Sequence, residues 1–527
     1  MTSVQQREIW NTKVGLVFAL AGNAVGLGNL LRFPVQAAQN GGGAFMVPYF
    51  ISLILLGIPL MWVELAIGRR GGVHGFGTTP GMFGLLWRHP MARYLGAFGV
   101  LIPTGLVVYY SYIVSWCLGY SFFSAAGSYF GEDTRTGMGS FLDGYIGVEA
   151  NQHFANLGAA YFFFAVTMLL SVWILSRGVV RGLEMLAKVA MPVLMLLGLV
   201  LVARVLTLDP LPGNPEGWDI SHGLGFIWNP DLSSLTSAKV WLAAAGQVFF
   251  TLSLGFGAIQ TYASYIREKQ DLALTGLATA GVNESVEVII GGTLAIPAAV
   301  VFFGLAQTRE IAEGGAFSLG FLSVPVVFQQ IPAGQFFGCL WFLLLFIAGI
   351  TSSVGMSQPA MAFLQEEFQI SRRKAAIMLG VGLFILSQPV ILFMEFGFLD
   401  EMDYWVGTFG LVVMALMEII LFAWVFGMDN AWEEITRGAQ LNIPRVYYYV
   451  IKYVTPTALL VILGVWGYQD AFGVLMMDGV AEEAVPYKWG ARLLLLALLL
   501  AIMYGIHKRW GGQPPDAPEH MPKEGDA

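Results

Sequence analysis

The chain has 527 residues, of which 56% are hydrophobic and only 12% are charged. Soluble domains carry about 25% charged residues. This composition, with a mean hydropathy of +0.67, therefore excludes a soluble protein and predicts a polytopic membrane protein. The net charge of −8 says little about nucleic acid, and no basic run suggests a nucleic-acid partner. Cys117 and Cys339 lie in apolar runs, which favours buried thiols over a disulfide.

Windows of about 20 apolar residues predict twelve transmembrane spans. The windows are residues 14–37, 43–68, 92–125, 157–175, 185–206, 240–266, 275–305, 336–366, 375–395, 404–426, 447–469 and 490–507. We divide the chain into a first repeat at 1–206 with five spans, a second repeat with its outer loop at 207–426, also with five, and a pair of spans at 427–510. The proline-containing tail at 511–527 is predicted to be a disordered cytoplasmic segment.

Lys and Arg are distributed unequally between the two ends of these spans. With the N-terminus inside, 20 of the 27 fall on the cytoplasmic side or in the tails. Cytoplasmic loops carry the excess of positive charge, so we expect a multi-pass protein of the plasma (inner) membrane with both termini cytoplasmic. The basic residues left on the outer side are Arg32, Arg135, Arg204, Lys239, Arg309, Lys488 and Arg492.

Residues 17–34 form an apolar run that is interrupted by polar residues and glycines. The stretch contains the polar residues Asn23, Asn29 and Arg32 and the glycines Gly22, Gly26 and Gly28. Glycine costs about 1 kcal/mol relative to alanine in a helix interior, and each unsatisfied backbone group in hydrocarbon costs several kcal/mol. A helix break here is tolerable only where the freed groups face protein, water or a ligand. A glycine-packed helix crossing is the alternative interpretation.

A second stretch of this kind lies at 250–258, where Gly255-Phe256-Gly257 repeats the pattern of Gly26-Leu27-Gly28. Two Gly-interrupted spans at corresponding places in two halves indicate inverted repeats with a substrate site between them. Because five is an odd number, the second set of five spans begins on the opposite side of the membrane from the first. We therefore predict an all-α integral membrane fold: a 5+5 inverted repeat with two broken helices, plus two peripheral helices.

Several polar side chains inside the spans could bind ions. Ala348, Thr351 and Ser352 are spaced at i, i+3 and i+4 and lie on one helical face. Asn283 and Glu287 share another face at a spacing of four residues. Such oxygen ligands suit small hard cations, although a Ser or Thr in a membrane helix usually bonds only the carbonyl one turn back. Glu64 is as compatible with transport as with satisfying the backbone of a broken helix.

The ends of half-helices at a break carry opposite partial charges, positive at N-termini and negative at C-termini. A zwitterionic amino acid suits such a place, because its carboxylate can meet free N–H groups and its ammonium can meet free carbonyls. The two breaks therefore predict an amino-acid site.

Five motifs extend this argument: residues 22–34 (GNAVGLGNLLRFP), 40–45 (NGGGAF), 249–258 (FFTLSLGFGA), 348–353 (AGITSS) and 399–403 (LDEMD). Together they make the chain, from Arg7 to about Ile506, resemble the neurotransmitter:sodium symporters, particularly their bacterial leucine-transporter branch. The resemblance implies the LeuT fold, uptake of an amino acid by alternating access, and two Na+ ions.

The resemblance also implies the residues of the binding sites. The substrate would contact Asn23, Ala24, Leu27, Gly28, Leu106, Tyr110, Phe250, Thr251, Ser253, Phe256, Ser352 and Met356. The first Na+ would be held by Ala24, Asn29, Thr251 and Asn283 together with the substrate carboxylate. The second would be held by carbonyls of Gly22, Val25 and Ala348 and hydroxyls of Thr351 and Ser352.

Two gates are implied as well. On the outer side Tyr110 and Phe250 would cover the substrate, with Arg32 and Asp403 paired above them. On the cytoplasmic side Arg7 would pair with Glu366, which is one methylene longer than the aspartate expected there. Trp10 would plug the inner vestibule.

Departures from family patterns predict the specificity. Glu287 supplies a carboxylate where chloride-dependent members have a neutral residue, which implies chloride independence. Gly26 stands where monoamine transporters place an aspartate, which favours substrates that bring their own carboxylate. Leu106 replaces a valine and favours smaller aliphatic side chains, an effect that the adaptable Met356, in place of an isoleucine, could offset.

We therefore expect a sodium-coupled, chloride-independent symporter of neutral, small aliphatic amino acids, embedded in membrane lipid. A homodimer is compatible with the sequence. A proton-coupled transporter of the same fold, with Glu287 as the proton carrier, is one alternative. A sensor that binds amino acids without transporting them is another. An enzyme is disfavoured, because the chain has no Gly-x-Ser-x-Gly, His-Glu-x-x-His or phosphate-loop motif.

Overall fold

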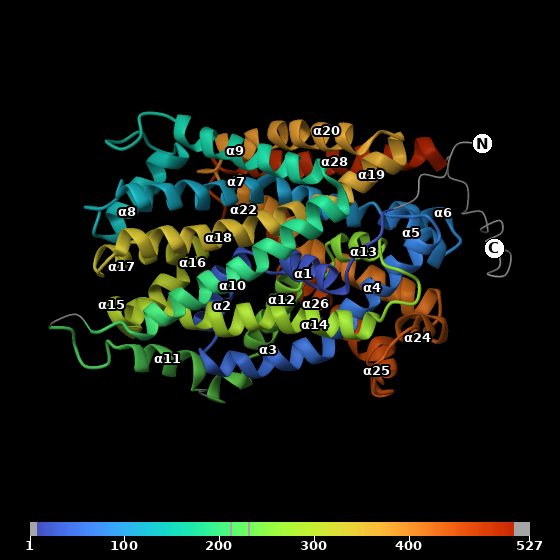
Figure 1. Cartoon of the computed structure of the whole chain (residues 1–527), viewed down its shortest axis with the longest axis horizontal. Coiled ribbons are helices and arrows are strands. Elements are labelled where there is room, and N and C mark those ends of the chain that lie inside the picture. Colours follow the sequence, from blue (N-terminus) through green and yellow to red (C-terminus); the bar gives the residue numbers. More distant parts are fainter. Residues whose placement is uncertain (1–7, 211–212, 230–231, 511–527) are drawn as a thin grey trace.

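The computed structural model describes residues 8–210, 213–229 and 232–510. Most of these residues are in helices. No β-strand occurs in these ranges. The helices form one elongated bundle, in which α1 and α12 lie in the middle and α10 crosses over them (Figure 1). In the labels, η marks π- or 3-10-helical turns. The predicted tail at 511–527 lies outside the described residues.

The first half contains the helices of spans one to five. Their bounds are α1 Lys13–Ala24, η1 Gly28–Arg32, α2 Phe33–Gln39, η2 Gly43–Phe45, α3 Met46–Ser52, η3 Leu53–Gly57, α4 Ile58–Val73, α5 Thr79–Leu86, α6 Pro90–Leu95, α7 Phe98–Ala126, α8 Arg135–Ile146, α9 Gly158–Ser176, η4 Val179–Glu184 and α10 Met185–Leu206.

The second half contains spans six to ten. Their helices and connecting turns are α11 Ile220–Trp228, η5 Leu232–Thr236, α12 Ala238–Thr251, α13 Ala258–Ala263, α14 Leu272–Glu284, η6 Ser285–Gly291, α15 Gly292–Glu313, α16 Gly315–Phe317, η7 Ser318–Ser323, α17 Val324–Gln329, α18 Gly334–Met356, α19 Gln358–Phe368, α20 Arg372–Leu386, α21 Gln388–Leu392, α22 Phe398–Met402, η8 Asp403–Phe409, α23 Gly410–Ile419 and η9 Ile420–Val425.

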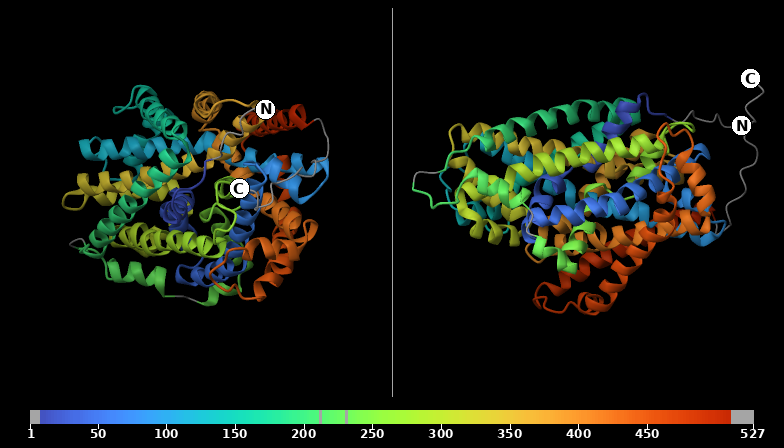
Figure 2. Two further views of the ribbon diagram at one scale, coloured as in Figure 1. Left: turned by 45° about the vertical axis from the view of Figure 1, so that its right-hand side comes forward. Right: turned by 90° about the horizontal axis from the view of Figure 1, so that it is seen from below.

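The remaining helices follow the second half, and part of them, drawn orange-red to red, projects from one side of the bundle in the right-hand view of Figure 2. They are α24 Met428–Thr436, α25 Val446–Tyr449, η10 Val450–Val454, α26 Thr455–Gln469, α27 Ala471–Met476 and α28 Val485–Trp510. Spans eleven and twelve are α25–α26 and α28, the two peripheral spans of the prediction.

The predicted twelve spans agree with the helices. Ten stretches are long and apolar enough to cross a membrane, and α1 with η1–α2 forms an eleventh that bends by 54°. The window at 240–266 corresponds to α12 and α13, two shorter helices of 14 and 6 residues separated by a break. This accounts for the twelfth window.

Both predicted breaks are present. In the first span α1 stops at Ala24, and Val25 is extended before the helix resumes at Gly28. In the sixth span the helix is interrupted between Thr251 and Ala258, and Gly255 and Gly257 have φ of +75° and +71°. A Cβ at Gly257 would come within 2.2 Å of the Gly99 carbonyl oxygen, so only glycine fits this position.

Glu64 satisfies the backbone of the second break. Its Oε1 accepts a hydrogen bond of 2.8 Å from the Gly255 N–H, and the residue is completely buried. Of the two roles that the sequence left open, the structure therefore supports the structural one.

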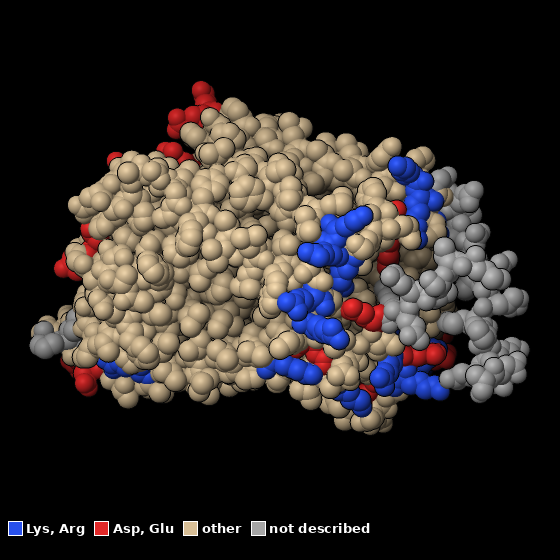
Figure 3. Space-filling view, turned by 45° about the horizontal axis from the view of Figure 1, so that its top comes forward, with Lys and Arg blue, Asp and Glu red and all other residues tan. Residues whose placement is uncertain are grey.

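The outer surface of the bundle is apolar over its middle. A broad region without Lys, Arg, Asp or Glu covers the face in Figure 3, and basic side chains gather toward one end of it. Exposed leucine, valine and isoleucine on α9, α10 and α20 contribute to such surfaces. This is the surface that a bilayer requires.

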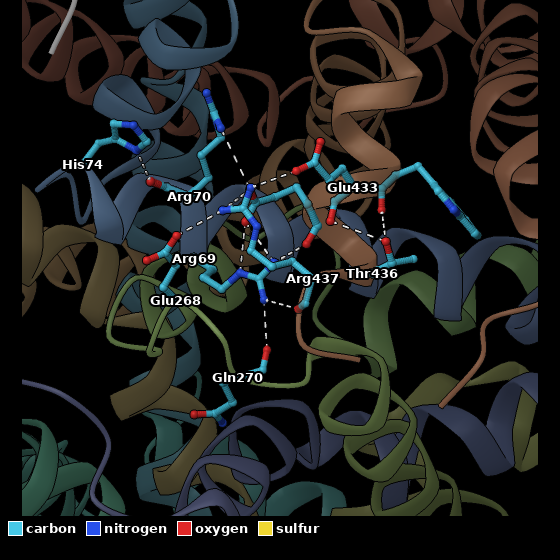
Figure 4. Close-up of polar contacts among 10 residues, drawn as sticks. Arg69, Arg70, His74, Glu268, Gln270, Glu433, Thr436 and Arg437 are labelled. Atoms are coloured by element: carbon cyan, nitrogen blue, oxygen red, sulfur yellow. Dashed lines mark hydrogen bonds and ion pairs between the residues drawn. The ribbon is translucent and has the colours of Figure 1, made fainter. Parts of the chain in front are cut away.

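A buried ionic cluster joins α4, α24 and the segment after α13 (Figure 4). The guanidinium of Arg69 lies 2.9 Å from Glu434 Oε1 and also donates to the carbonyls of Gln270, Glu434 and Arg437. The side chains of Arg69 and Glu434 are 0% and 4% exposed. Arg437, which lies 3.6 Å from Glu434, is 36% exposed.

Replacing Arg69 by Met should destabilise the protein by about 3–5 kcal/mol, because Glu434 would stay buried without its partner. Arg437→Met should cost less than about 1 kcal/mol, since water screens that pair. Thermal unfolding in detergent measures the difference. Equal losses for the two variants would mean that Arg69 does not compensate the Glu434 charge.

Candidate functional site

A pocket lies between the two helix breaks, at the centre of the bundle. It is lined by Asn23, Ala24, Gly26, Gly28, Asn29, Leu106, Tyr110, Phe250, Ser253, Phe256, Ser352 and Met356. The lining combines apolar and aromatic side chains with a few polar groups, which is typical of small-molecule sites. Of the twelve predicted substrate residues only Leu27 and Thr251 are not in the lining.

Tyr110 and the first break are in close contact. The Tyr110 hydroxyl accepts a 3.1 Å hydrogen bond from the Leu27 N–H. A Cβ at Gly26 would lie 2.8 Å from this hydroxyl and 2.9 Å from Ser352 Oγ, and a Cβ at Gly28 would lie 2.6 Å from the Phe250 ring. The two glycines therefore let the broken backbone reach the pocket wall.

Four oxygen-bearing side chains meet beside the pocket. The amide nitrogen of Asn29 lies 2.9 Å from each of Thr251 Oγ1, Asn283 Oδ1 and Glu287 Oε2. An amide has only two hydrogens to donate, so three oxygens around one point suit a cation better than they suit the amide. The Asn29 Oδ1 accepts a 2.8 Å hydrogen bond from the Gly26 N–H, so a half-turn of the amide would give up this bond and bring the oxygen to the set.

Gln247 is a member of this cluster that the sequence analysis missed. Its amide donates a 2.8 Å hydrogen bond to Glu287 Oε1, while the Thr251 hydroxyl donates to Oε2. Gln247 precedes Thr251 by four residues in α12, so helical spacing could have identified it. Gln247 therefore fixes the orientation of the carboxylate.

A second oxygen set joins α1 to α18. Ser352 Oγ lies 3.0 Å from the Val25 carbonyl oxygen and 3.4 Å from that of Gly22, and Thr351 Oγ1 lies 2.9 Å from the Ala348 carbonyl oxygen. All five predicted ligands of the second Na+ are thus close together, and all are neutral. In residues 8–210, 213–229 and 232–510 no group of three His, Cys, Asp or Glu could hold a metal ion. Neutral oxygens suit a monovalent hard cation.

The outer gate differs from the prediction. Arg32 does not pair with Asp403 within 4.0 Å in the described part of the chain; its guanidinium lies over the Phe250 ring, 4.2 Å from the centroid. Asp403 instead accepts a 2.5 Å hydrogen bond from the Tyr109 hydroxyl. The cation–π contact and the tyrosine hydrogen bond satisfy the two charged groups separately.

On the opposite side of the pocket, Trp10 is buried against the inner half of the sixth span. Its indole N–H donates 2.8 Å to the Tyr262 carbonyl, and its backbone N–H donates 3.2 Å to that of Tyr265. Glu366 accepts from the Gly77 N–H and the Thr78 hydroxyl. Arg7, its predicted partner, lies outside the described residues.

Comparison with known proteins identifies the family of this chain. The model of the sodium:neurotransmitter symporter family matches residues 7–130 and 138–504. The chain belongs to the sodium:neurotransmitter symporter family. It is therefore a multi-pass membrane transporter of a sodium-coupled family, as the motifs predicted.

Relatives of this symporter cover nearly its whole length. An uncharacterized sodium-dependent transporter of Methanocaldococcus jannaschii is 30% identical over 95% of this chain and 98% of its own. One of Haemophilus influenzae is 30% identical over 88% and 98%. The crystal structure of MhsT in complex with L-phenylalanine has 30% identity and a TM-score of 0.72, over 87% of this chain and 99% of MhsT. The agreement with MhsT supports the predicted LeuT fold.

If the set on α1 and α18 binds Na+, removing one of its hydroxyls should weaken that binding. We expect Thr351→Val or Ser352→Ala to lower the apparent Na+ affinity about ten- to hundredfold, because about 1–3 kcal/mol of ligand interaction is lost. The measurement is the thermal stability of the symporter as NaCl replaces KCl. Ser353→Ala is the control, since Ser353 bonds to Ser111 outside the set. Equal losses in all three variants would contradict the site.

Proposed function

We propose that this protein is a sodium-coupled, chloride-independent symporter of neutral amino acids with a preference for small aliphatic side chains. The proposal depends on one observation above all: two clusters of oxygen ligands flank a small pocket at two helix breaks. One cluster includes a carboxylate and the other is neutral. Such an arrangement suits two Na+ ions and one zwitterion.

The coupling would arise where substrate and ion touch. The carboxylate of an amino acid at the Leu27 and Gly28 amides would lie beside Asn29 and complete the coordination of the first Na+. Neither ligand then binds well without the other, which is a reciprocal coupling of binding free energies. The ammonium would meet carbonyls at the ends of the half-helices, which carry partial negative charge.

The substrate class is inferred from the pocket and from one relative. Gly26 offers no carboxylate to a free amine, and the backbone there is too close to Tyr110 and Ser352 for a side chain to be added. MhsT has been crystallised with L-phenylalanine, which favours amino acids as a class. The preference for small aliphatic side chains depends on Leu106 and Met356, which both line the pocket.

The energy available would suffice for concentrative uptake. Each Na+ that enters down about 100 mV gains about 2.3 kcal/mol, and a tenfold gradient adds about 1.4 kcal/mol. Two ions would supply roughly 7 kcal/mol, enough for a substrate ratio near 10⁵ at the limit.

Alternating access would need a gate on each side of the pocket. The rings of Tyr110 and Phe250, with Arg32 above Phe250, would form the outer gate, and Trp10 the inner plug. Arg32 and Asp403 would approach one another when the outer side closes further. We propose cytoplasmic termini, because 20 of the 27 Lys and Arg then lie inside.

Uptake into proteoliposomes tests the proposal. With an inward Na+ gradient we expect accumulation of radiolabelled alanine and leucine, unchanged when gluconate replaces chloride, and none with a K+ gradient. Alanine should compete better than tryptophan, since Leu106 narrows the pocket. Accumulation driven by a proton gradient alone would favour the proton-coupled alternative. Binding without accumulation would favour a sensor.

The Glu287 carboxylate is proposed to replace chloride, and substituting it separates the two transport mechanisms. Glu287→Ser should make uptake depend on chloride, with at least about tenfold loss in gluconate, because the Na+ charges then lack a compensating anion. Glu284→Gln, three residues earlier in the same span, should remain chloride-independent. Chloride is varied at constant Na+. If Glu287→Ser abolishes transport in chloride and gluconate alike, the role assigned to Glu287 is wrong.

A further inference from the structure

Four exposed basic residues lie at the ends of spans four, five and nine. Arg177 follows α9, Arg181 lies in η4, and Arg373 and Lys374 are in the first turn of α20. None of them lies within 4.0 Å of an Asp or Glu oxygen among the described residues. We call these four residues the α9–α20 basic cluster.

Helix packing brings these residues together. α9 and α20 run antiparallel: the Tyr161 hydroxyl donates 2.6 Å to Gln388 at one end, and Phe164 stacks on Phe384 with centroids 5.5 Å apart. At the other end Arg372 Nε donates 2.8 Å to the Leu175 carbonyl. The first turn of α20 therefore lies beside the last turn of α9 and the start of η4.

Several other basic residues have acidic partners. Arg69, Arg70 and Arg437 each pair with Glu434, Lys188 pairs with Glu184, and Arg509 pairs with Glu367. The nearest carboxylate to the basic cluster on the N-terminal segment is Glu8, which accepts a 2.5 Å hydrogen bond from the Val179 N–H. The cluster therefore keeps an excess of positive charge.

Below the cluster the same helices expose apolar side chains. They are Phe162, Val166, Leu169 and Trp173 on α9, Ile377, Met378, Val381, Phe384 and Ile385 on α20, and Met185, Val189 and Leu196 on α10. On α9 the exposed positions recur at i, i+4, i+7 and i+11, which is one face of a helix. Trp173 also lies under Arg177, 4.8 Å from its guanidinium.

We propose that the α9–α20 basic cluster binds the phosphate of an anionic phospholipid whose acyl chains lie along these apolar faces. Arginine recognises phosphate through paired N–H donors, and a juxtamembrane cluster of Lys and Arg attracts anionic lipid. Tryptophan is typical of the level at which headgroups lie. A free phosphate would use the cations but not the apolar faces, so the site is assigned to a lipid.

Thermal unfolding of the full-length protein in detergent, with three probes, tests this site. The probes are dioctanoyl phosphatidylglycerol, dioctanoyl phosphatidylcholine and inorganic phosphate. We expect only phosphatidylglycerol to raise the melting temperature in a saturable way. The quadruple variant R177Q/R181Q/R373Q/K374Q should need at least about tenfold more of it, because each cation contributes to the attraction.

The control variant K13Q/R88Q/R445Q/K508Q removes the same charge from exposed positions elsewhere and should respond like the unmodified protein. If the quadruple variant does not fold, the pair variants R177Q/R181Q and R373Q/K374Q replace it, and each should lose part of the response. An unchanged response in these variants, or an equal response to phosphatidylcholine or inorganic phosphate, would overturn the proposal.

Discussion

The whole arrangement depends on the need to satisfy backbone groups freed inside a membrane. Each such group costs several kcal/mol when it faces hydrocarbon, so a broken helix must have partners close by. Glu64 provides one at Gly255, and the Tyr110 hydroxyl provides another at Leu27. Both breaks therefore lie at the centre of the bundle, where the surrounding spans shield them (Figure 1). The pocket forms between them for the same reason.

Buried charged groups also need partners close by. Two buried carboxylates are met by several donors: Glu287 has Gln247, Thr251 and Asn29, and Glu434 has the fork of Arg69. The two clusters differ in accessibility, because the first adjoins the pocket whereas the second is closed off by its own helices. A carboxylate beside a cavity can respond to a ligand, while one locked to an arginine holds helices together.

Much of this could be predicted from the sequence. Apolar windows located the ten long apolar stretches and the bent pair of α1 with η1–α2, and glycines in apolar runs located both breaks, because a membrane allows few alternatives for the backbone. Ten of the predicted substrate residues line the pocket, and six of them belong to the two motifs at the breaks. The direct pairing of Arg32 with Asp403 was not found, because Phe250 and Tyr109 compete for the same groups. Such choices depend on side-chain geometry across several helices, which spacing along one chain does not encode.

Trp10 illustrates a link that substitution of side chains would not reveal. One of its two hydrogen bonds to the sixth span runs from its own backbone N–H to the Tyr265 carbonyl, and any residue except proline could make it. The segment before α1 is thus joined to α13 partly through the main chain. A search that exchanges one side chain at a time would underestimate how firmly these two segments move together. Replacing the peptide N–H of residue 10 by an ester oxygen would remove this one backbone hydrogen bond and would measure its contribution to the contact between the two segments.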